Sequence, residues 1–581
     1  MTVPPVDRNP ELKWHTAMWS RVTALVSQRE EQVFLVLSLV IGALAGLSVV
    51  AFIVLTERLG LRIYPVGSPA WRRLAMPVTG ALAMGYLLFR YFPDARGSGV
   101  PQTKAALYAR EGKILLSTVL GKFGCTAATL ASGIPLGREG PSVQVGAGIA
   151  SVLGRWLGLR PEKVKALIPV GAAAAVAAAF NTPMAAVLFA LEEVVGDLHA
   201  PVLGSVVLAS ATSWAVLRLL LGNNPLFHVP EYQLVHPLEF GIYAVLGVAG
   251  GFLSVAFTKL LLEMRKRFLL LPRSSRWWHP VVGGVMVGIM GMFVPQVLGV
   301  GYVYVGQALN GSMALKLMVL LVVLKLFAIT TAYASGNAGG IFGPALFLGA
   351  MLGGAIGTVA HHLLPTYTAA PGAYALVGMG ALFAGIVRAP MTSVLMIFEM
   401  TRDYAVIVPL MIANLASLFI SSRFQKQPIY EALAHQDGIH LPSRKSQEEF
   451  SGHIVSQVMR PAAEILPAQI SVRDAVERTR ASELRTWPVE DEGSVVGVLS
   501  REAMQCAFVD DSEQSLRSLL ATLEFPHIHP DHPLHLALER MSKSHLDLLP
   551  VVSRADIHKM EGVVTLRDVL DSYGVDSTGL A

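Results

Sequence analysis

The sequence has little charge and almost no cysteine. Of its 581 residues, 15% are charged and 53% are hydrophobic, and only two are cysteines. Soluble domains usually carry about 25% charged residues, so this composition excludes a large soluble protein and predicts a polytopic membrane protein. The cysteines, Cys125 and Cys506, are too few for a disulfide framework. The net charge of +5 is small, and no nucleic-acid-binding pattern accompanies it.

Sequence patterns typical of enzymes are also missing. The chain has no Walker lysine motif, no His-Glu zinc pattern and no nucleophile elbow. Regulated transport of a divalent metal is a further alternative, but it would require rings of carboxylates along the pathway. The sequence therefore favours a non-enzymatic membrane protein that needs no cofactor.

Charge is distributed unevenly along the chain. Residues 326–387 contain no Asp, Glu, Lys or Arg, whereas the chain after about Glu431 is densely charged, which predicts a membrane part followed by a soluble part. Basic residues precede the first apolar run, which begins at Val33 and is too long for a signal peptide. We therefore expect a cytoplasmic N-terminus in a multi-pass protein of the cell (inner) membrane.

A carboxylate stands inside a glycine-rich apolar stretch, GIPLGREGPSVQVGAG, at 133–148. An ionised group at bilayer depth is costly, so Glu139 is predicted to serve a pathway. The surrounding Gly and Pro residues interrupt the helix, and helix N-termini attract anions. The alternative is that Glu139 only pairs with the adjacent Arg138.

Two halves of the membrane part repeat each other. GSGVPQTKAAL at 97–107 aligns with GVGYVYVGQAL at 299–309, and GREGPSVQVGA at 137–147 aligns with GIFGPALFLGA at 340–350. A third match relates the segments that end at Glu193 and Met400. Duplicated halves with short, broken helices place a substrate site at their interface near the midplane.

The third match separates two neighbouring acids. It pairs Glu192 with Glu399, so this position is interpreted as a scaffold feature of both halves. Glu193 is opposite Met400 and is therefore the better functional candidate, although acids at a helix end are often simply solvated. Lys122, within another apolar segment, is expected either to tune the local field or to extend to the membrane interface.

Four stretches resemble the signature sequences of the CLC chloride channel and transporter family. They are GSGVP at 97–101, GREGP at 137–141, GIFGP at 340–344 and PIYEAL at 428–433. Val100 and Gly343 depart from the usual residues but leave the donor positions intact. The resemblance implies an all-α membrane domain with an inverted repeat of broken helices, and a homodimer with one complete pathway in each subunit.

The resemblance assigns a chloride site. The backbone N–H groups of Ile341 and Phe342 and the hydroxyls of Ser98 and Tyr430 would bind the ion, with Gly140 also at the site. Such donors hold an anion without a full positive charge that would trap it. The alternatives are that Ser98 only caps a helix beginning near Pro101 and that Tyr430 lies in an interfacial aromatic belt.

The resemblance also assigns two acids to proton movement. Ionised Glu139 would occupy an anion position and block it, and protonated Glu139 would swing away. Glu193 would be the internal proton-transfer glutamate, a position at which channel-type members tend to have an apolar residue. These assignments favour an exchanger of chloride and protons; the alternative is a passive chloride channel, gated by voltage or pH, with the same fold.

The soluble tail contains a second repeat, which resembles paired CBS domains of α/β structure. SVRDAVE at 471–477 matches PLHLALE at 533–539, and WPVE at 487–490 matches LPVV at 549–552. The resemblance implies that Thr565 and Asp568 could bind an adenine nucleotide, whereas the first copy has Ser500 and Ala503. A purely structural pair is the alternative. The histidines at 527, 529, 532 and 535 are interpreted as an exposed linker rather than a metal site.

The predicted domains follow from these repeats. The partners expected are chloride, protons, the lipid bilayer and a second copy of the chain, without nucleic acid. The domains are a cytoplasmic N-terminal tail at 1–32, a membrane domain at 33–436 with halves at about 33–222 and 236–436, a linker at 437–452, and a CBS pair at 453–577 with copies at about 453–510 and 518–577.

Overall fold

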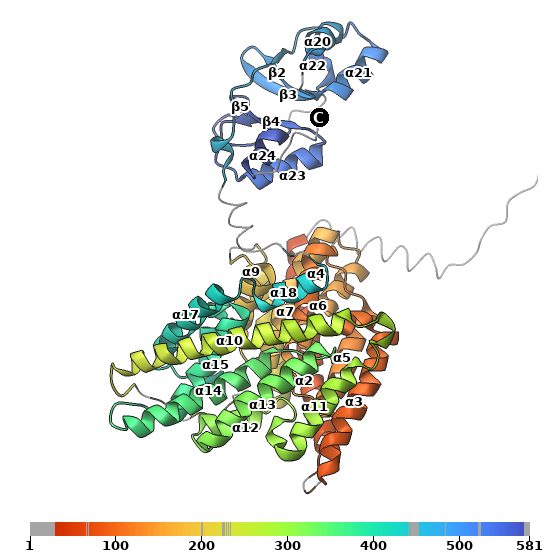
Figure 1. Ribbon diagram of the computed structural model, residues 1–581. Helices are drawn as coiled ribbons and strands as arrows, with labels where there is room; N and C mark the ends of the chain where they lie inside the picture. The colour runs from red at the N-terminus through yellow and green to blue at the C-terminus, as the bar shows by residue number, and fades with distance from the viewer. Residues whose placement is uncertain are drawn as a thin grey trace, which may run out of the picture. The chain divides into compact units, whose positions relative to one another are not determined.

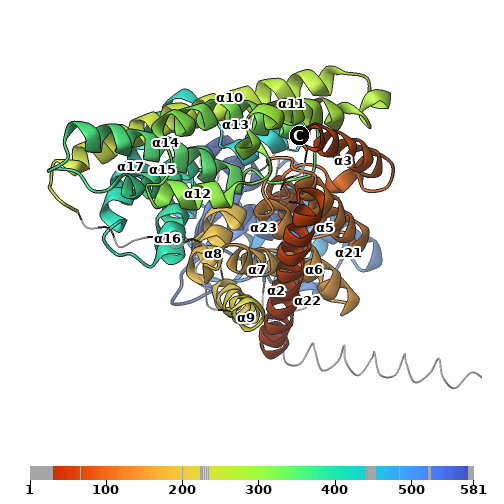
Figure 2. The same cartoon turned by 90° about the horizontal axis from the view of Figure 1, so that it is seen from below.

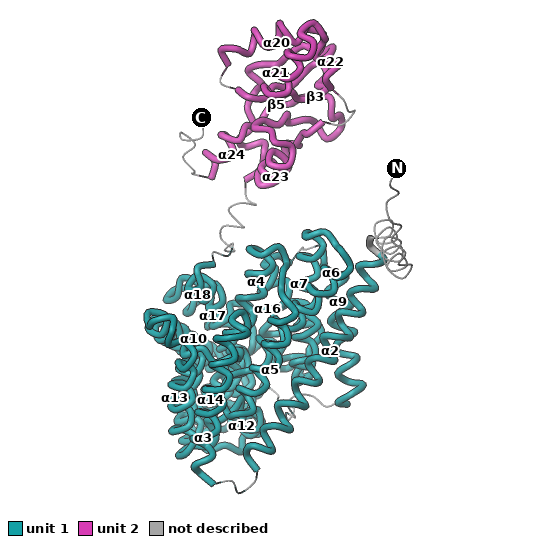
Figure 3. The backbone as a smooth tube through the Cα atoms, turned by 90° about the vertical axis from the view of Figure 1, so that its right-hand side faces the viewer, with its two compact units in different colours: residues 1–441 teal, residues 442–581 magenta. Residues whose placement is uncertain are grey.

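The chain folds into two compact units, residues 1–441 and 442–581 (Figure 3). The computed structural model describes residues 30–573 except 66, 68, 199–200, 223–226, 228, 230–231, 233, 440, 442–452, 483 and 521–524. Most of the predicted N-terminal tail and of the predicted linker therefore lies outside the described residues. Each unit is considered by itself.

The first unit consists of helices (Figure 1). Seven helices among the described residues are long and apolar enough to cross a membrane. This confirms the predicted all-α membrane part. The α-helices are α2 (Glu30–Ile63), α3 (Ala70–Arg90), α4 (Val100–Ala109), α5 (Leu116–Ala131), α6 (Glu139–Trp156), α7 (Pro161–Phe180), α8 (Pro183–Phe189), α9 (Leu203–Leu221), α10 (Glu239–Leu270), α11 (His279–Phe293), α12 (Tyr302–Leu309), α13 (Leu315–Ala334), α14 (Phe342–Leu363), α15 (Pro371–Val387), α16 (Pro390–Thr401), α17 (Ile407–Phe424) and α18 (Ile429–Gln436).

Short turns of other helix types complete this unit. The 3₁₀ helices are η1 (Pro93–Ala95), η3 (Arg273–Ser275) and η4 (Pro295–Val297), and η2 (Ala190–Val195) is a π-helix. The π-helix continues directly from α8 and carries Glu192 and Glu193. Because π-turns occur often at functional sites, the position of these two acids is notable.

The same helix break occurs in both halves. α7 ends at Asn181 and α15 ends at Arg388, both with left-handed backbone at φ 61° and 65°. Two residues later, α8 and α16 each begin with proline at the first helical position, where its missing N–H costs nothing. In Figure 2 the helices α5 to α9 gather on one side and α12 to α17 on the other.

Equivalent glycines let equivalent helices approach closely. α6 packs along α7 and α14 packs along α15. A Cβ on Gly146 would collide with the carbonyl oxygen of Gly171, and a Cβ on Gly349 would collide with the carbonyl oxygen of Gly378. The two halves therefore use the same backbone contact to seat α6 and α14.

The halves meet through backbone at the loops that precede α6 and α14. Gly137 and Gly340 form an antiparallel bridge in which each N–H donates to the other carbonyl at 2.7 Å. These glycines are equivalent in the sequence repeat. Two equivalent loops that pair antiparallel run in opposite directions, as an inverted repeat requires.

The second unit is α/β, as predicted. Its strands form a three-stranded sheet in the order β1-β2-β3 and a two-stranded sheet, β4-β5. β2 and β3, like β4 and β5, pair antiparallel with a bulge after Val489 and after Val551, which are equivalent positions. The elements are η5 (Val455–Gln457), β1 (Leu466–Pro467), α20 (Val472–Thr479), β2 (Thr486–Asp491), β3 (Ser494–Ser500), α21 (Arg501–Asp510), α22 (Leu516–Leu519), α23 (Leu534–Ser544), β4 (Leu548–Val552), β5 (Met560–Thr565) and α24 (Leu566–Ser572).

Candidate functional site

Glu139 lies at the N-terminus of a helix from the other half. The residue begins α6 and is completely buried. Its Oε2 accepts a hydrogen bond of 3.2 Å from the N–H of Gly343, the second residue of α14, and its Oε1 accepts one from the hydroxyl of Tyr302. Free N–H groups and the helix dipole make this position suitable for an anion. The carboxylate therefore occupies a place that a halide would also favour.

Arg138 does not neutralise its neighbour. Its Nη1 lies 3.7 Å from Oε1 of Glu57, and its guanidinium stacks 5.5 Å from the ring centre of Tyr302. The alternative that Glu139 merely pairs with Arg138 is wrong. Sequence spacing gave no signal for Tyr302, although it lies in GVGYV, the second-half counterpart of GSGVP.

Ser98 is buried in the loop before α4. Its N–H donates to the hydroxyl of Tyr333 at 3.2 Å, while its Oγ has no hydrogen-bond partner among the described residues. The residue that caps α4 is Gly99. The alternative that Ser98 caps this helix is therefore wrong, and its hydroxyl is available to a ligand.

Tyr430 lies on α18 and is also completely buried. Like the Ser98 Oγ, its hydroxyl is buried and lacks a hydrogen-bond partner within the described part of the chain. Burial excludes a position in an interfacial aromatic belt. Leaving a buried polar group unsatisfied costs about 1–3 kcal/mol. Because α18 packs on α4, which follows Ser98, two such hydroxyls lie on neighbouring elements.

The remaining predicted anion ligands lie at the start of α14 and on α6. Ile341 precedes the helix and Phe342 begins it, so their N–H groups have no acceptor within the helix. Gly140 packs so closely on the Ser98 loop that a Cβ there would lie 2.5 Å from the Ser98 carbonyl oxygen. The Phe342 ring is held among aromatic rings at centroid distances of 4.8–6.3 Å, namely those of Phe180, Phe189, Phe383 and Tyr430.

Glu193 forms a buried ion pair. Its Oε1 lies 2.9 Å from Nζ of Lys104 on α4, and both side chains are less than 10% exposed. Lys104 belongs to the same GSGVPQTKAAL stretch as Ser98, but sequence reasoning did not single it out. A lysine that is the one charged residue of a short helix was the available signal. Thus α4, which follows the loop that carries Ser98, also contacts Glu193, the second residue predicted to transfer protons.

Glu192 and Glu399 cap each other's helices. Oε2 of Glu192 accepts hydrogen bonds from the N–H of Thr392 at 2.8 Å and from its hydroxyl at 2.6 Å, near the start of α16. The Glu399 carboxylate accepts from the N–H groups of Met184 and Ala185 at 3.0 and 2.7 Å, at the start of α8. The interpretation of this position as a scaffold feature of both halves is confirmed.

Lys122 and Lys325 are a second equivalent pair. Nζ of Lys122 donates to the carbonyls of Ala95 and Gly97 at 3.0 and 2.6 Å. Nζ of Lys325 donates to Gly299 and Val300 at 3.0 and 2.7 Å. Lys122 is completely buried, so the expectation that it extends to the interface is wrong. Each lysine instead ties down the loop that precedes a short helix, α4 or α12.

In the soluble unit, the residues predicted to bind a nucleotide form contacts within the chain. Thr565 and Asp568 form a capping box at the start of α24, with Thr565 Oγ1 donating to Asp568 Oδ2 at 2.7 Å. Arg460 Nη2 lies 2.5 Å from Asp568 Oδ1. In the first copy, Ser500 Oγ accepts only from the N–H of Ala503 at 3.2 Å. A nucleotide ribose would have to replace one of the contacts of Asp568.

The histidine-rich segment is not an exposed linker, because its middle is built into the fold. Ile528 is completely buried and pairs with Val551 of β4. His527 and His529 on either side are half-buried. No group of three or more metal-binding side chains was found within the described ranges.

Comparisons with known proteins agree on both units. The sequence profile of the family described as "Voltage gated chloride channel" matches residues 80–422, and that of the CBS domain matches 455–507 and 517–574. The chain is 32% identical over 417 residues to the "H(+)/Cl(-) exchange transporter ClcA" of Vibrio campbellii, which covers 69% of this chain and 89% of that protein.

Solved structures with the same fold include transporters from distant organisms. A slow cyanobacterial Cl⁻/H⁺ antiporter has 27% sequence identity and a TM-score of 0.63, covering 70% of this chain and 97% of the antiporter. A eukaryotic CLC transporter has 19% identity and a TM-score of 0.62, covering 92% of this chain and 97% of the transporter.

Proposed function

Because the chain belongs to the voltage-gated chloride channel family, we propose that it transports chloride across the membrane in exchange for protons, with Glu139 as gate and proton carrier. One observation carries the proposal. The Glu139 carboxylate is completely buried and accepts a hydrogen bond from the N-terminus of α14, where a dehydrated anion would be stabilised. The relatives named as H⁺/Cl⁻ exchange transporters support the same activity.

In this proposal chloride binds beside the carboxylate. The unpartnered hydroxyls of Ser98 and Tyr430 donate to the ion, together with N–H groups of Ile341 and Phe342. Gly140 allows the Ser98 loop to lie against α6, since a larger residue would collide with that loop. All these donors are neutral, so the ion is stabilised without being trapped.

Protonation of Glu139 opens the anion route. The ionised carboxylate competes with chloride for the N–H of Gly343, and protonation removes the charge that holds it there. Tyr302, which donates to the other oxygen, orients the ionised side chain. Each opening therefore takes up a proton, and each closing releases one, which links proton movement to chloride movement.

In this scheme, Glu193 transfers protons between Glu139 and the cytoplasmic surface of the membrane. Its carboxylate is paired with Lys104, so proton transfer requires the pair to separate. That requirement also favours the alternative, a passive chloride channel in which Glu193 and Lys104 are only a structural pair.

Simultaneous flux measurements distinguish these functions. The full-length protein is reconstituted in liposomes with an outward chloride gradient, and chloride and proton fluxes are recorded together. An exchanger will move protons into the liposomes against their gradient as chloride leaves. Chloride flux without any proton movement would instead establish the passive channel.

The proposal includes an assembly and a location. Large apolar side chains are exposed on α17 at helical spacing, among them Met411, Leu415 and Phe419, and a second copy packed there would make a homodimer within the bilayer. The protein lies in the cell membrane with both termini in the cytoplasm, as the basic N-terminal residues indicate. Mild crosslinking in detergent that yields only monomers would overturn the dimer.

The proposal also includes regulation by an adenine nucleotide that binds at Thr565 and Asp568. Both oxygens of Asp568 already have partners within the chain, so nucleotide binding has to compete with Arg460. Calorimetry on the full-length protein and on an Asp568→Asn variant tests it. Equal heats of ATP binding would exclude this site.

A further inference from the structure

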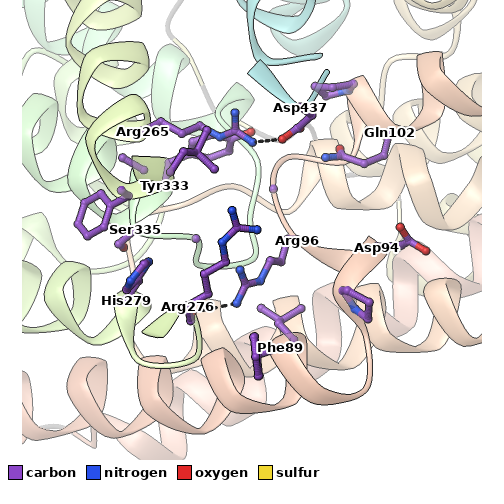
Figure 4. Close-up of a pocket in the computed structure, with 18 of the residues that line it drawn as sticks. Phe89, Asp94, Arg96, Gln102, Arg265, Arg276, His279, Tyr333, Ser335 and Asp437 are labelled. Carbon is purple, nitrogen blue, oxygen red and sulfur yellow. Dashed lines mark hydrogen bonds and ion pairs between the residues drawn. The ribbon is translucent and has the colours of Figure 1, made fainter. Parts of the chain in front are cut away.

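A cavity of about 490 Å³ lies in the membrane unit outside the proposed chloride ligands (Figure 4). The end of α10, the start of α11 and the loop between η1 and α4 contribute to its wall. Asp437 and Ile439, near the end of this unit, close another side. Its volume is in the range of small-molecule sites, about 300–1,000 Å³, and far larger than a chloride ion requires.

The cavity is strongly basic. Five arginines and two aspartates line it, and both aspartates are engaged. Asp437 pairs with Arg265 at 2.5 Å, and Asp94 pairs with Arg110 at 3.5 Å. The other three arginines, at 96, 273 and 276, have no carboxylate partner within the part of the chain that the structure describes. The described residues therefore leave a net positive charge in the cavity without a compensating carboxylate.

Two of these arginines lie side by side in the middle of the cavity (Figure 4). Nη2 of Arg96 donates to the backbone carbonyl of Arg276 at 3.0 Å. The Nε atoms of both guanidiniums are buried, and neither has a hydrogen-bond partner among the described residues. Burial, and then the charge of Arg276, lower the pKa of the Arg96 guanidinium. Two like charges in one partly desolvated place are unfavourable unless an anion joins them.

The shape of the donors identifies the class of anion. Guanidinium groups present N–H donors in a planar fork that matches phosphate oxygens in pairs. We infer that this cavity binds a phosphate-bearing anion between Arg96 and Arg276, and that the bound anion inhibits chloride transport. The phosphate can come from a soluble compound or from a lipid headgroup, and the experiment separates these sources.

Inhibition follows from what the cavity shares with the anion route. Gly97 and Tyr333 both line it. Gly97 precedes Ser98 in the chain, and the hydroxyl of Tyr333 accepts the N–H of Ser98. A ligand held against these residues restricts the loop that presents the Ser98 hydroxyl. Transport slows without any ligand contact to Glu139.

Binding is tested on the full-length protein in detergent, so that the result does not depend on transport. Pyrophosphate will raise the melting temperature of the wild type, because a ligand that binds only the folded state stabilises it. Arg96→Gln and Arg276→Gln will each weaken the effect roughly tenfold or more in pyrophosphate concentration, as expected for loss of a charged hydrogen-bonding group. Among the described residues, neither arginine has a carboxylate partner that the substitution would leave unpaired.

Two matched variants control for charge and for the soluble unit. Arg267→Gln removes an arginine from the same end of α10, where it is exposed and pairs with Glu263 outside the cavity, and it will leave the effect of pyrophosphate unchanged. Asp568→Asn will also leave it unchanged, because it alters only the soluble unit. Chloride efflux from liposomes, measured with pyrophosphate on both sides, will show inhibition that Arg96→Gln relieves.

The source of the phosphate is decided by a second set of liposomes that contain phosphatidic acid. Inhibition by the lipid alone that depends on Arg96 identifies a headgroup ligand, and inhibition by pyrophosphate alone identifies a soluble one. The inference is wrong if neither compound acts on the wild type, or if the active compound acts on Arg96→Gln and Arg276→Gln as strongly as on the wild type. It is also wrong if chloride at equal ionic strength gives the same arginine-dependent stabilisation.

Discussion

The two halves of the membrane unit share their supports and differ in their reactive groups. Lys122 and Lys325 hold equivalent loops, and Glu192 and Glu399 cap each other's helices. In contrast, Glu139 corresponds to Phe342, a residue without a titratable side chain. Duplication thus preserved the parts that hold the halves together. The acids assigned to proton movement occur in the first half only.

The loops that precede α4 and α12 differ in the same way. Ser98 in the first half corresponds to Val300 in the second, so only the first half has a hydroxyl at this position. The second half contributes the N-terminus of α14 and Tyr302, both of which bind the Glu139 carboxylate. The site is therefore formed from one loop of each half rather than from two equivalent sites. Four predictions test this division of roles.

The largest effect is expected at Glu139. Glu139→Gln removes the charge that competes with chloride at the start of α14, while leaving the side-chain volume unchanged. Chloride flux should become independent of pH and proton transport should stop. The measurement is chloride and proton flux from liposomes between about pH 4.5 and 7.5, a range around the ordinary carboxylate and histidine pKa values. A variant whose chloride flux still rises with acid would show that another group gates the route.

Glu193→Ala should abolish proton coupling but leave most chloride flux intact. The residue has no counterpart acid in the second half, and it pairs with Lys104 on α4. Proton uptake driven by a chloride gradient is the measurement. A double variant with Lys104→Met serves as the control for the stranded lysine. Proton coupling that survives in both variants would exclude the relay.

Lys122→Met and Lys325→Met should destabilise the protein to a similar extent. Each removes the ammonium group that donates to two loop carbonyls, at a cost of about 1–3 kcal/mol for each buried group that is left unsatisfied. Thermal melting in detergent measures this effect. The two variants should also differ in function. Lys122→Met should weaken chloride binding, because it releases the loop that carries Ser98. Lys325→Met should alter the pH dependence of chloride flux, because it releases the loop before Tyr302, which contacts Glu139. Identical functional effects would contradict the division between the halves.

Tyr430→Phe should have the smallest effect. It removes one hydroxyl that has no partner among the described residues and keeps the packing of the ring on Phe342. Chloride affinity measured by calorimetry should fall by about 1 kcal/mol, the usual net contribution of one hydrogen bond. Unchanged affinity would remove Tyr430 from the chloride site.

Sequence reasoning was most successful where the repeat itself supplied the information. The offset between the halves predicted that Glu192 and Glu399 are equivalent, and their reciprocal caps confirm it. It also predicted broken helices, because Gly and Pro recur at matching positions. The fold class and the family followed from the same matches.

Contacts between distant elements could not be predicted in this way. Tyr302 reaches Glu139 across 163 positions in the chain, and Lys104 reaches Glu193 across 89. Such pairs depend on how helices cross, which a single sequence does not encode locally. The direction of Lys122 depended on the same geometry, because a lysine stem can extend to water or bend toward buried carbonyls.

The paired glycines between the halves limit which motions the protein can make. Separating the loops at Gly137 and Gly340 breaks two short hydrogen bonds together, both within buried surroundings. Their amide hydrogens should therefore exchange with deuterated water only when the two halves come apart, far more slowly than amides at helix ends. If exchange at these two amides stays slow during transport, the opening and closing proposed at Glu139 involve side-chain rotations and the loops around this link, without rocking of one half against the other.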